Sequence, residues 1–142
     1  MTSLLVLHVE DDDNDVLLMR RAWMKAGVRH RLQTVSDGEE AIRYLSGEGP
    51  YVNRVEHPMP TLVLLDLNLP KVLGLEVLKW IRAQPSLAGL RVIVFSSSTR
   101  EADRSAAAAL GATAYFVKPN RYDNWVAMVT ALKTSWLEPE TP

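Results

Sequence analysis

An apolar run that ends on a single carboxylate is the feature that most constrains this chain. Residues 62–65 (L-V-L-L) precede Asp66, and a segment containing Asn68, Pro70 and Gly74 follows. A short continuous apolar run is typical of a strand buried in a parallel sheet, and Gly and Pro mark loops. Ligands bind outside the carboxyl ends of such strands. The sequence therefore predicts Asp66 at the edge of a crevice, although a lone Asp there can also be a simple turn cap.

Four more segments have strand character, and segments of helical periodicity alternate with them. The predicted strands span residues 4–9, 31–35, 62–65, 91–95 and 113–117. The predicted helices span residues 13–26, 39–45, 75–83, 101–110 and 122–136. This alternation predicts one α/β domain with a parallel sheet covered by helices on both faces. The Gly- and Pro-rich loop at 46–60 is long for this class and indicates either a function or a family insertion. Its His57 is expected to be exposed.

Four of the predicted strands end on polar side chains. These are Glu10 with Asp11, Asp66, Ser96 and Lys118. Right-handed crossovers bring the carboxyl ends of parallel strands to one edge, so the four sets are expected to converge.

Three other polar residues have simpler interpretations. We expect His8, inside the first strand, to be a core histidine with satisfied hydrogen bonds. Asp13 and Asp15 are expected to cap the helix that follows, because Asp accepts from free N–H groups and complements the helix dipole.

The converging groups suit phosphoryl chemistry. An oxygen-only cluster of Glu10, Asp11 and Asp66 favours a hard cation, and few protein ligands favour Mg²⁺ over Ca²⁺. The backbone carbonyl of Asn68 is a candidate further ligand. A carboxylate such as Asp66 can act as a nucleophile and form an aspartyl phosphate. Mg²⁺ and Lys118 would supply the positive charge that phosphoryl oxygens need, and Ser96 would donate a hydrogen bond to one of them.

Taken together, these motifs resemble the receiver domain of two-component response regulators. The resemblance is carried by V-E-D at 9–11, D-G-E-E-A at 37–41, L-L-D-L-N-L-P at 64–70, V-F-S-S at 94–97 and A-Y-F-V-K-P at 114–119. Ser96 follows Asp66 by 30 residues and Lys118 follows it by 52, as expected of this family. The resemblance covers residues 4–136 and implies a single receiver domain with a flavodoxin-like sheet of strand order 2-1-3-4-5.

The resemblance implies a role for each residue at the acidic end of the site. Asp66 matches the phosphoacceptor, Asp11 the direct Mg²⁺ ligand, and Glu10 its partner acting partly through water. Asp12 replaces Asp11 as the candidate if the strand register is shifted by one residue. Asn68 matches the position whose backbone carbonyl binds the metal.

The resemblance also implies a switch. Ser96 matches the switch hydroxyl, more often Thr in this family, and Lys118 matches the phosphate-binding lysine. Pro119 after that lysine suggests a cis peptide bond, which only X-Pro bonds adopt at low cost. Tyr115 matches the aromatic residue that turns inward when the hydroxyl moves to the phosphate. Asn68 and Ser98 stand at positions that tune phosphate lifetime.

One feature of the sequence departs from the usual family pattern, and another resembles a particular subgroup of the family. The family often has Asp-Gly where this chain has Leu73-Gly74, which affects mainly the loop. The 46–60 loop and the D-L-N-L-P-K segment resemble single-domain regulators paired with bacterial phytochrome histidine kinases. The resemblance therefore implies a sensor histidine kinase partner, with a bacteriophytochrome as one candidate. With no residues left for an output domain, the 101–110 helix, 113–117 strand and last helix are expected to bind a partner or form a homodimer.

Composition excludes several other classes. The 142 residues carry a formal net charge of -1, which gives no bulk electrostatic case for nucleic acid or an anionic membrane. Without Cys there is neither a disulfide nor a thiolate metal site, which permits a reducing cytoplasm. No apolar run is long enough to span a bilayer, and the N-terminus lacks the basic region of a signal peptide. We expect a cytoplasmic protein.

Two alternatives remain open from the residues alone. A phosphatase of the haloacid dehalogenase type also uses Asp, Mg²⁺, Ser or Thr and Lys, but it usually needs a second Asp two residues after the nucleophile, where this chain has Asn68. A pseudo-receiver would bind proteins without being phosphorylated, yet all the site groups are present here. A nucleotide-binding fold is disfavoured because the sequence contains no G-x-G-x-x-G or G-K-[ST] motif. The sequence thus favours a phosphoacceptor switch over an enzyme.

Overall fold

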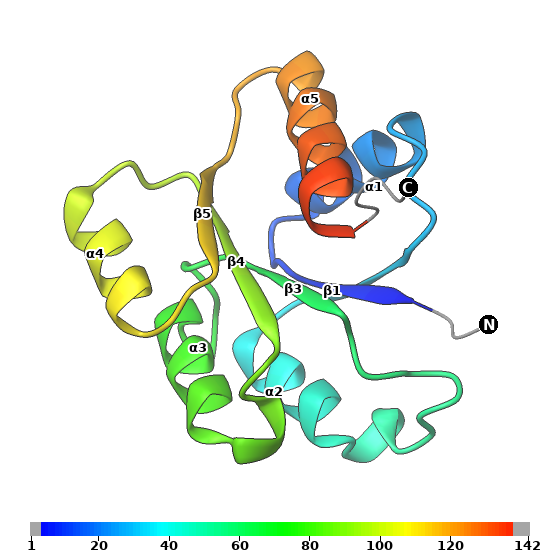
Figure 1. The fold of residues 1–142 in the computed structure, drawn as a ribbon, viewed down its shortest axis with the longest axis vertical. Helices are drawn as coiled ribbons and strands as arrows, with labels where there is room; N and C mark the ends of the chain where they lie inside the picture. Colours follow the sequence, from blue (N-terminus) through cyan, green and yellow to red (C-terminus); the bar gives the residue numbers. More distant parts are fainter. Residues whose placement is uncertain (1–3, 138–142) are drawn as a thin grey trace.

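A five-stranded parallel sheet lies between two layers of helices in the computed structural model, which describes residues 4–137 (Figure 1). The strand order is β2-β1-β3-β4-β5, which confirms the predicted flavodoxin-like topology. The strands are β1 (Leu5–Val9), β2 (Arg31–Val35), β3 (Leu62–Leu65), β4 (Arg91–Ser96) and β5 (Ala114–Val117). The helices are α1 (Asp13–Lys25), α2 (Gly38–Ser46), α3 (Gly74–Ala83), α4 (Glu101–Ala109) and α5 (Tyr122–Leu132).

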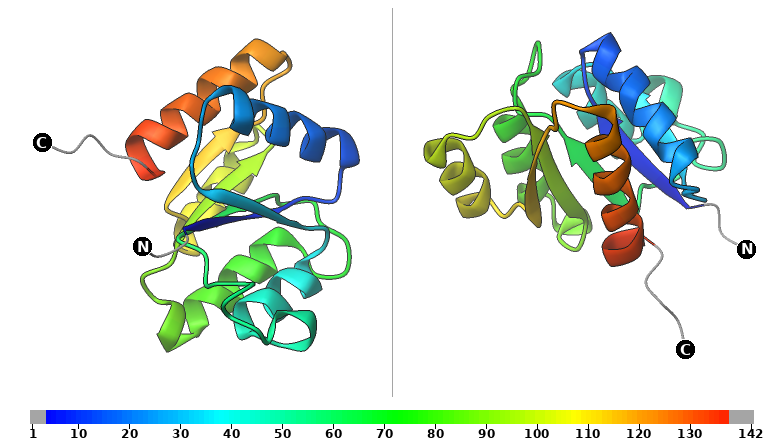
Figure 2. Two further views of the ribbon diagram at one scale, coloured as in Figure 1. Left: turned by 90° about the vertical axis from the view of Figure 1, so that its right-hand side faces the viewer. Right: turned by 90° about the horizontal axis from the view of Figure 1, so that it is seen from above.

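Alternate residues of each central strand enter different hydrophobic cores, because successive side chains of a strand point to opposite faces. Helices α1 and α5 cover one face of the sheet and α2 and α3 cover the other, as Figure 2 shows. On β3, Val63 and Leu65 pack against α2 and α3, whereas Leu62 and Leu64 pack against α1 and α5. This two-sided burial explains why the run had no polar alternation in the sequence.

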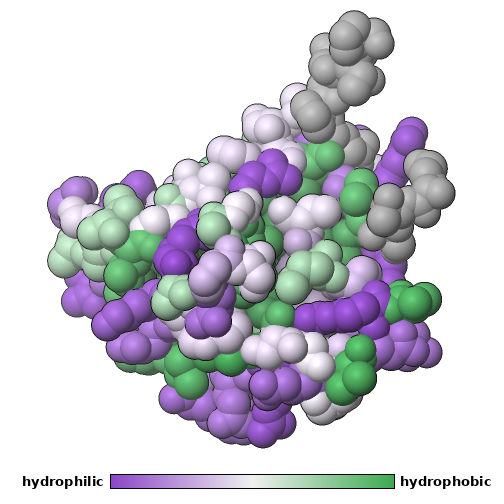
Figure 3. All heavy atoms as spheres, turned by 60° about the horizontal axis from the view of Figure 1, so that its bottom comes forward, coloured by the Kyte–Doolittle hydropathy of each residue, from purple (hydrophilic) through white to green (hydrophobic). Residues whose placement is uncertain are grey.

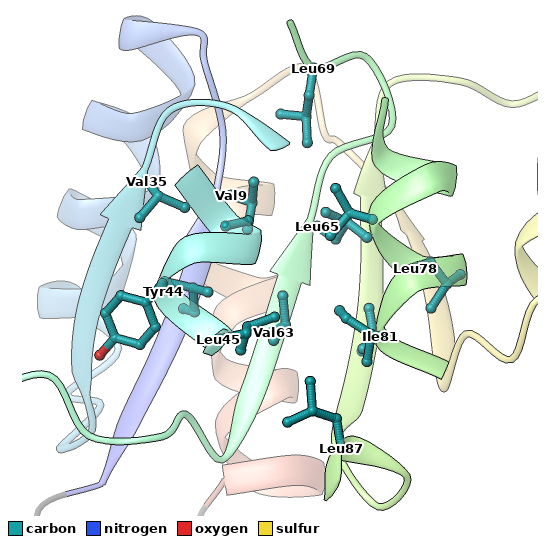
Figure 4. Packing of buried hydrophobic residues seen from close by; sticks show 14 of the residues in the cluster. Val9, Val35, Tyr44, Leu45, Val63, Leu65, Leu69, Leu78, Ile81 and Leu87 are labelled. Atoms are coloured by element: carbon teal, nitrogen blue, oxygen red, sulfur yellow. The ribbon is translucent and has the colours of Figure 1, made fainter. Parts of the chain in front are cut away.

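Figure 4 shows the core beneath α2 and α3. Leu78 and Ile81 of α3 and Tyr44 and Leu45 of α2 lie against the inner strands, among Val63 and the other labelled side chains. On the opposite face the rings of Phe95 and Trp125 meet edge to face, with 5.1 Å between centroids. Trp125 is 2% exposed, so it belongs to the core rather than to a surface available for dimerisation.

The ends of two helices differ from the sequence-based prediction. The side chain of Asp12 caps α1 by accepting from the backbone N–H groups of Asn14 and Asp15, so the prediction that Asp13 and Asp15 form the cap is wrong. Both do lie in the first turn of α1, where they complement the helix dipole as predicted. A cap must stand before the first helical residue, and Asp12 occupies that position. Helix α5 ends at Leu132 and continues as a π-helical turn, η3 (Lys133–Leu137).

The 46–60 loop is anchored by an aromatic cluster rather than being freely exposed. It contains a 3₁₀ turn, η1 (Gly49–Tyr51), and the ring of Tyr51 lies 4.8 Å from that of Tyr44 on α2. The half-buried ring of His57 contacts both tyrosine rings edge-on, which corrects the expectation that it is exposed. Arg54 stacks on Tyr44 and donates to the backbone carbonyls of Leu45 and His57.

The loop between β3 and α3 is tightly packed against its neighbours. A Cβ at Gly74 would lie 2.1 Å from the backbone oxygen of Asp66, so only glycine fits there. A Cβ at Gly38, where α2 begins, would lie 2.1 Å from the backbone oxygen of Val72 in the same loop. Leu73 stands at the N-cap of α3 and provides no side-chain hydrogen bond to the helix. Close backbone packing at the two glycines therefore holds this loop in place, without a side-chain cap on α3.

His8 lies in the core as predicted, but its hydrogen bonds are not satisfied as expected. Its side chain is 1% exposed on β1, and neither ring nitrogen has a hydrogen-bond partner. Burial lowers the pKa of His8 to about 3, and the charges of Lys118 and Arg20 add to the fall. The neighbour on β2, Thr34, also has a buried hydroxyl without a partner. His8 is thus a neutral core residue whose hydrogen-bonding capacity is unmet among the described side chains.

Helix α4 is the least embedded helix, with only Ala107 buried. On the face seen in Figure 3, hydrophobic side chains are interspersed with polar ones. The 46–60 loop carries three of the exposed hydrophobic residues, Val52, Val55 and Met59. Within residues 4–137, no helix combines the length and the apolar character needed to cross a bilayer.

Candidate functional site

Three carboxylates meet at the carboxyl ends of β1 and β3. Glu10, Asp11 and Asp66 each offer an oxygen that lies within 4.8 Å of the others. The parallel register of Val9 against Leu65 explains this proximity, because each strand ends on its acids at the same level. A cavity of about 560 Å³ opens above them; its lining is Glu10, Asp11, Asp12, Asp13, Asn14, Asp15, Asp66, Asn68, Ser97 and Lys118.

Asp66 is nearly buried, with 5% of the residue exposed. Its Oδ1 accepts a hydrogen bond of 2.8 Å from the backbone N–H of Leu67. Its Oδ2 lies 3.5 Å from Nζ of Lys118. One oxygen is therefore held by the loop, while the other lies beside the lysine at the cavity.

Glu10 is the most deeply buried acid of the group, with 1% exposed. Burial raises the pKa of Glu10 to about 7, an effect that Lys118 opposes and the charge of Asp66 reinforces. The backbone N–H of Asp12 lies 3.3 Å from its Oε2. Asp11 is exposed at the rim, and Asp12 turns away to cap α1, so Asp11 rather than Asp12 joins the cluster.

Lys118 is the cation of the site. Its Nζ lies 2.8 Å from Oε1 of Glu10, 2.8 Å from Oδ2 of Asp15 and 3.5 Å from Oδ2 of Asp66. Burial acts to lower the pKa of Lys118, but the hydrogen bonds to Asp15 and Glu10 and the charge of Asp66 outweigh it, so the pKa is raised. The lysine thus stays charged and lies beside three carboxylates, of which its single charge can neutralise one.

The predicted cis peptide at Pro119 does not occur. Residues 4–137 contain no cis peptide bond, so the bond between Lys118 and Pro119 is trans. The backbone N–H of Lys118 bonds to the carbonyl of Ser96, and the indole of Trp125 donates to the carbonyl of Pro119. These contacts hold the chain on both sides in the isomer that X-Pro bonds intrinsically prefer by about 0.5–1 kcal/mol.

The carboxylate cluster fits a divalent cation. Carboxylate oxygens are ligands that hard cations prefer, and Asn68 stands on the rim of the same cavity. Three acids that crowd together repel one another unless a cation lies among them. Among the described residues, Lys118 is the one cation seen to pair with this cluster, and it is shared with Asp15, so the acids present favour binding of a divalent ion.

The hydroxyl residues after β4 lie at different depths. Ser96 is fully buried, and its Oγ accepts from the backbone N–H of Ser98. Ser97, one residue further, lines the cavity. The hydroxyl of Ser98 bonds to Asp103 of α4 and accepts from the backbone N–H of Arg100.

Tyr115 connects β5 to the same segment. Its hydroxyl donates a 2.9 Å hydrogen bond to the carbonyl of Ser98, and its ring packs against Val94 and Ala107. The guanidinium of Arg104 lies 4.9 Å from the ring centroid. Tyr115 therefore joins the loop after β4, strand β5 and helix α4.

Sequence reasoning missed two of these contacts. Asp15 was assigned to helix capping, and nothing in the local sequence indicates its ion pair with Lys118, which is 103 residues away. Arg104 had no assigned role. Both contacts depend on how α1 and α4 pack beside the sheet, which periodicity does not specify.

The comparison with known families agrees with this geometry. The profile described as "Response regulator receiver domain" matches residues 6–130. The chain belongs to this family. Receiver domains are phosphorylated on an aspartate in two-component signalling and act as switches rather than as enzymes of the usual kind, and the family implies histidine kinases as partners.

Three relatives are similar along nearly the whole chain. The response regulator Rcp1 of Synechocystis is 35% identical over 137 residues, covering 96% of this chain and 91% of Rcp1. The Mn²⁺-bound crystal structure of Rcp1 superposes with a TM-score of 0.87 over 97% of both chains.

The phosphorylated cyanobacterial phytochrome response regulator RcpA is 36% identical, with a TM-score of 0.89 over 99% of this chain and 98% of RcpA. The bacteriophytochrome response regulator RtBRR is also 36% identical, with a TM-score of 0.80 over 99% of this chain and 84% of RtBRR.

Proposed function

We propose that Asp66 accepts the phosphoryl group from the phosphohistidine of a sensor histidine kinase. An oxygen of Asp66 forms the new bond to phosphorus, the N–P bond of the donor breaks, and its electron pair stays on the imidazole. The single observation that carries this proposal is that Oδ2 of Asp66 lies beside Lys118, whereas Oδ1 is held by the N–H of Leu67. A carboxylate with one engaged oxygen and one oxygen next to a cation is suited to in-line attack.

The residues around Asp66 provide charge and orientation. Glu10, Asp11, Asp66 and the backbone carbonyl of Asn68 would hold Mg²⁺, which when bound supplies positive charge against the phosphoryl oxygens. Lys118 stabilises the opposite side of the phosphoryl group through its ammonium. The hydroxyl of Ser96 gives up its hydrogen bond with the N–H of Ser98 and donates a hydrogen bond to a phosphoryl oxygen. This set is supported by the spacing of the motifs and by the clustering of the acids.

Phosphorylation adds a charge of about -1.5 to -2 at the site, and that charge drives the switch. Movement of Ser96 toward the phosphoryl group alters the 96–98 segment, to which the hydroxyl of Tyr115 is bonded. Because Tyr115 packs on α4, the change reaches the surface formed by α4, β5 and α5. We assign output to this surface, through partner binding or formation of a homodimer.

The kinase we propose is a bacteriophytochrome located, like this regulator, in the cytoplasm. This is supported by the relatives named as phytochrome response regulators, RcpA and RtBRR, and by the 46–60 loop noted in the sequence. A near-neutral formal charge of -1 is consistent with a protein partner rather than nucleic acid.

Phosphate-affinity gel electrophoresis after incubation with acetyl phosphate tests the assignment. The wild-type protein should show a shifted band that requires Mg²⁺, and Asp66→Asn should lose it. Asp123→Asn, which removes an exposed carboxylate on α5, is the matched control and should retain the band. In a parallel experiment, phosphoryl transfer to the wild-type protein from a bacteriophytochrome kinase should be faster than transfer from an unrelated histidine kinase. A Mg²⁺-dependent phosphate that persists in Asp66→Asn would refute the phosphoacceptor assignment.

A further inference from the structure

Three carboxylates surround the ammonium group of Lys118 in the resting site, and the one from Asp15 accepts a hydrogen bond from it. An ammonium group has three donors and no acceptor. Glu10 and Asp15 each lie 2.8 Å from Nζ, and Asp66 lies at 3.5 Å. A phosphoryl oxygen can therefore approach this ammonium only by displacing or sharing one of these partners.

Asp15 differs from the other two partners because it comes from α1 and stands outside the metal cluster. Among the described residues, the acids that could hold a metal ion together are Glu10, Asp11 and Asp66. A cation held by this cluster would compete with Lys118 for the carboxylates of Glu10 and Asp66. Asp15 has no such competitor, so it remains as the counter-ion of Lys118.

The position of Asp15 is fixed by the start of α1. Its backbone N–H donates to the side chain of Asp12, the N-cap, at 3.0 Å. The side chain is about one-fifth exposed, in contrast to the exposed Asp13 on the same turn. Asp15 is thus held against Lys118, at the mouth of the cavity.

We propose that Asp15 is a positioning residue that competes with the phosphoryl group for Lys118 and so limits phosphoryl occupancy of Asp66. The proposal rests on the proposed function, in which Lys118 binds phosphoryl oxygens. Asp15 reduces the positive potential that Lys118 presents to the incoming group, which weakens anion binding in a partly desolvated cavity.

The substitution Asp15→Asn separates charge from shape. The amide keeps an oxygen that can accept from Lys118 but removes the carboxylate charge. We expect this variant to bind beryllofluoride, a phosphoryl analogue, about three- to tenfold more tightly in the presence of Mg²⁺, the range for removing one partly solvated charge partner. Fluorine NMR of bound beryllofluoride measures the dissociation constant, and acetyl phosphate labelling should accelerate in parallel. Asp123→Asn, which removes an exposed carboxylate of α5 outside the cavity, is the control and should change the constant less than twofold.

A double-mutant cycle distinguishes competition from a structural role. In a Lys118→Ala background, Asp15→Asn should no longer tighten beryllofluoride binding, because the group for which Asp15 competes is absent. Asp15→Glu, which restores the carboxylate, should return the wild-type constant to within about twofold. Thermal unfolding of each ligand-free variant checks that the fold is intact.

The outcomes also separate this inference from the proposed function. Unchanged or weaker binding by Asp15→Asn would overturn the competition, as would equal tightening by Asp123→Asn or tightening that survives in Lys118→Ala. If wild-type protein with Mg²⁺ does not bind beryllofluoride at all, the proposed function fails and the inference with it. Binding by the wild type without an effect of Asp15 overturns only the inference.

Discussion

At the scale of single residues, Gly74 shows how closely the site depends on backbone packing. A Cβ at this position would lie 2.1 Å from the backbone oxygen of Asp66 and 2.6 Å from Cα of Leu67. The start of α3 therefore sits directly on the residue proposed as the phosphoacceptor. The family resemblance included the glycine, but its physical reason becomes visible only in the structure.

We expect Gly74→Ala to destabilise the protein by about 1–3 kcal/mol, because the added methyl must push α3 away from the peptide of Asp66. Urea unfolding measures the loss. Gly89→Ala is the matched control, since a Cβ at Gly89 meets no atom within 4 Å, and it should change stability by less than about 1 kcal/mol in either direction. Equal stabilities for the two variants would contradict the close contact at Gly74.

Single residues also mark the limits of sequence reasoning. The metal cluster was predictable because each acid directly follows a buried strand, and strand ends meet by topology. The capping role of Asp12 was missed because three consecutive aspartates offer equivalent caps, and only the first helical residue decides among them. The partner of Asp15 was missed because the contact is not local in the chain.

At the scale of elements, the helices differ in how they begin. Helices α1 and α2 have Asp side chains as N-caps, Asp12 and Asp37, which accept backbone hydrogen bonds. Helix α3 has Leu73 at its N-cap, with 59% of the residue exposed and no side-chain hydrogen bond. The departure from the family's Asp-Gly therefore leaves the first turn of α3 without a side-chain acceptor.

Leu73→Ser should stabilise the protein by about 1 kcal/mol relative to Leu73→Ala, because only serine supplies the missing acceptor. Serine avoids adding a charge beside the metal cluster, and the alanine variant controls for loss of the exposed leucine. The backbone of Leu73 is already extended, as an N-cap requires (φ -63°, ψ 153°). Thermal unfolding of the three proteins measures the difference; equal melting temperatures for the serine and alanine variants would contradict it.

Element boundaries were predictable where burial was two-sided. The strands were located within one residue at every end. The runs of β1, β3 and β4 are apolar with His8 as the interruption, whereas β2 also contains Gln33 and Thr34 and is less buried. The 46–60 loop was not predictable, because its order depends on the contact of Tyr51 and His57 with Tyr44 of α2. Nothing in a Gly- and Pro-rich stretch indicates that it closes over an aromatic cluster.

At the scale of the whole molecule, two buried titratable groups, His8 on β1 and Glu10 directly after it, make stability depend on pH in opposite directions. The pKa of His8 is lowered to about 3, so the unfolded chain binds its proton first and stability is lost as the pH falls below about 6.5. The pKa of Glu10 is raised to about 7, so that group costs stability as the pH rises from about 4.5 to 7. In the metal-free protein the two effects partly offset each other.

Replacement of His8 should expose this compensation. We expect the stability of metal-free His8→Leu, relative to wild type, to rise as the pH falls from 7.5 to 5, because the variant has no neutral imidazole to protonate on unfolding. Thr34→Val removes the unpartnered hydroxyl beside it and serves as the control, with a pH dependence that parallels wild type. Urea unfolding at the two pH values measures both, and a constant difference between His8→Leu and wild type would contradict the assignment.

The shallow seating of α4 has a consequence for signalling. With Ala107 as its only buried residue, this helix loses little apolar contact when it shifts, since each buried methylene is worth about 0.8 kcal/mol. Couplings between sites in proteins are commonly about 1–3 kcal/mol, which is comparable with that anchoring energy. A coupling free energy of this size can therefore shift α4, while the strands that are packed on both faces by helices stay in place.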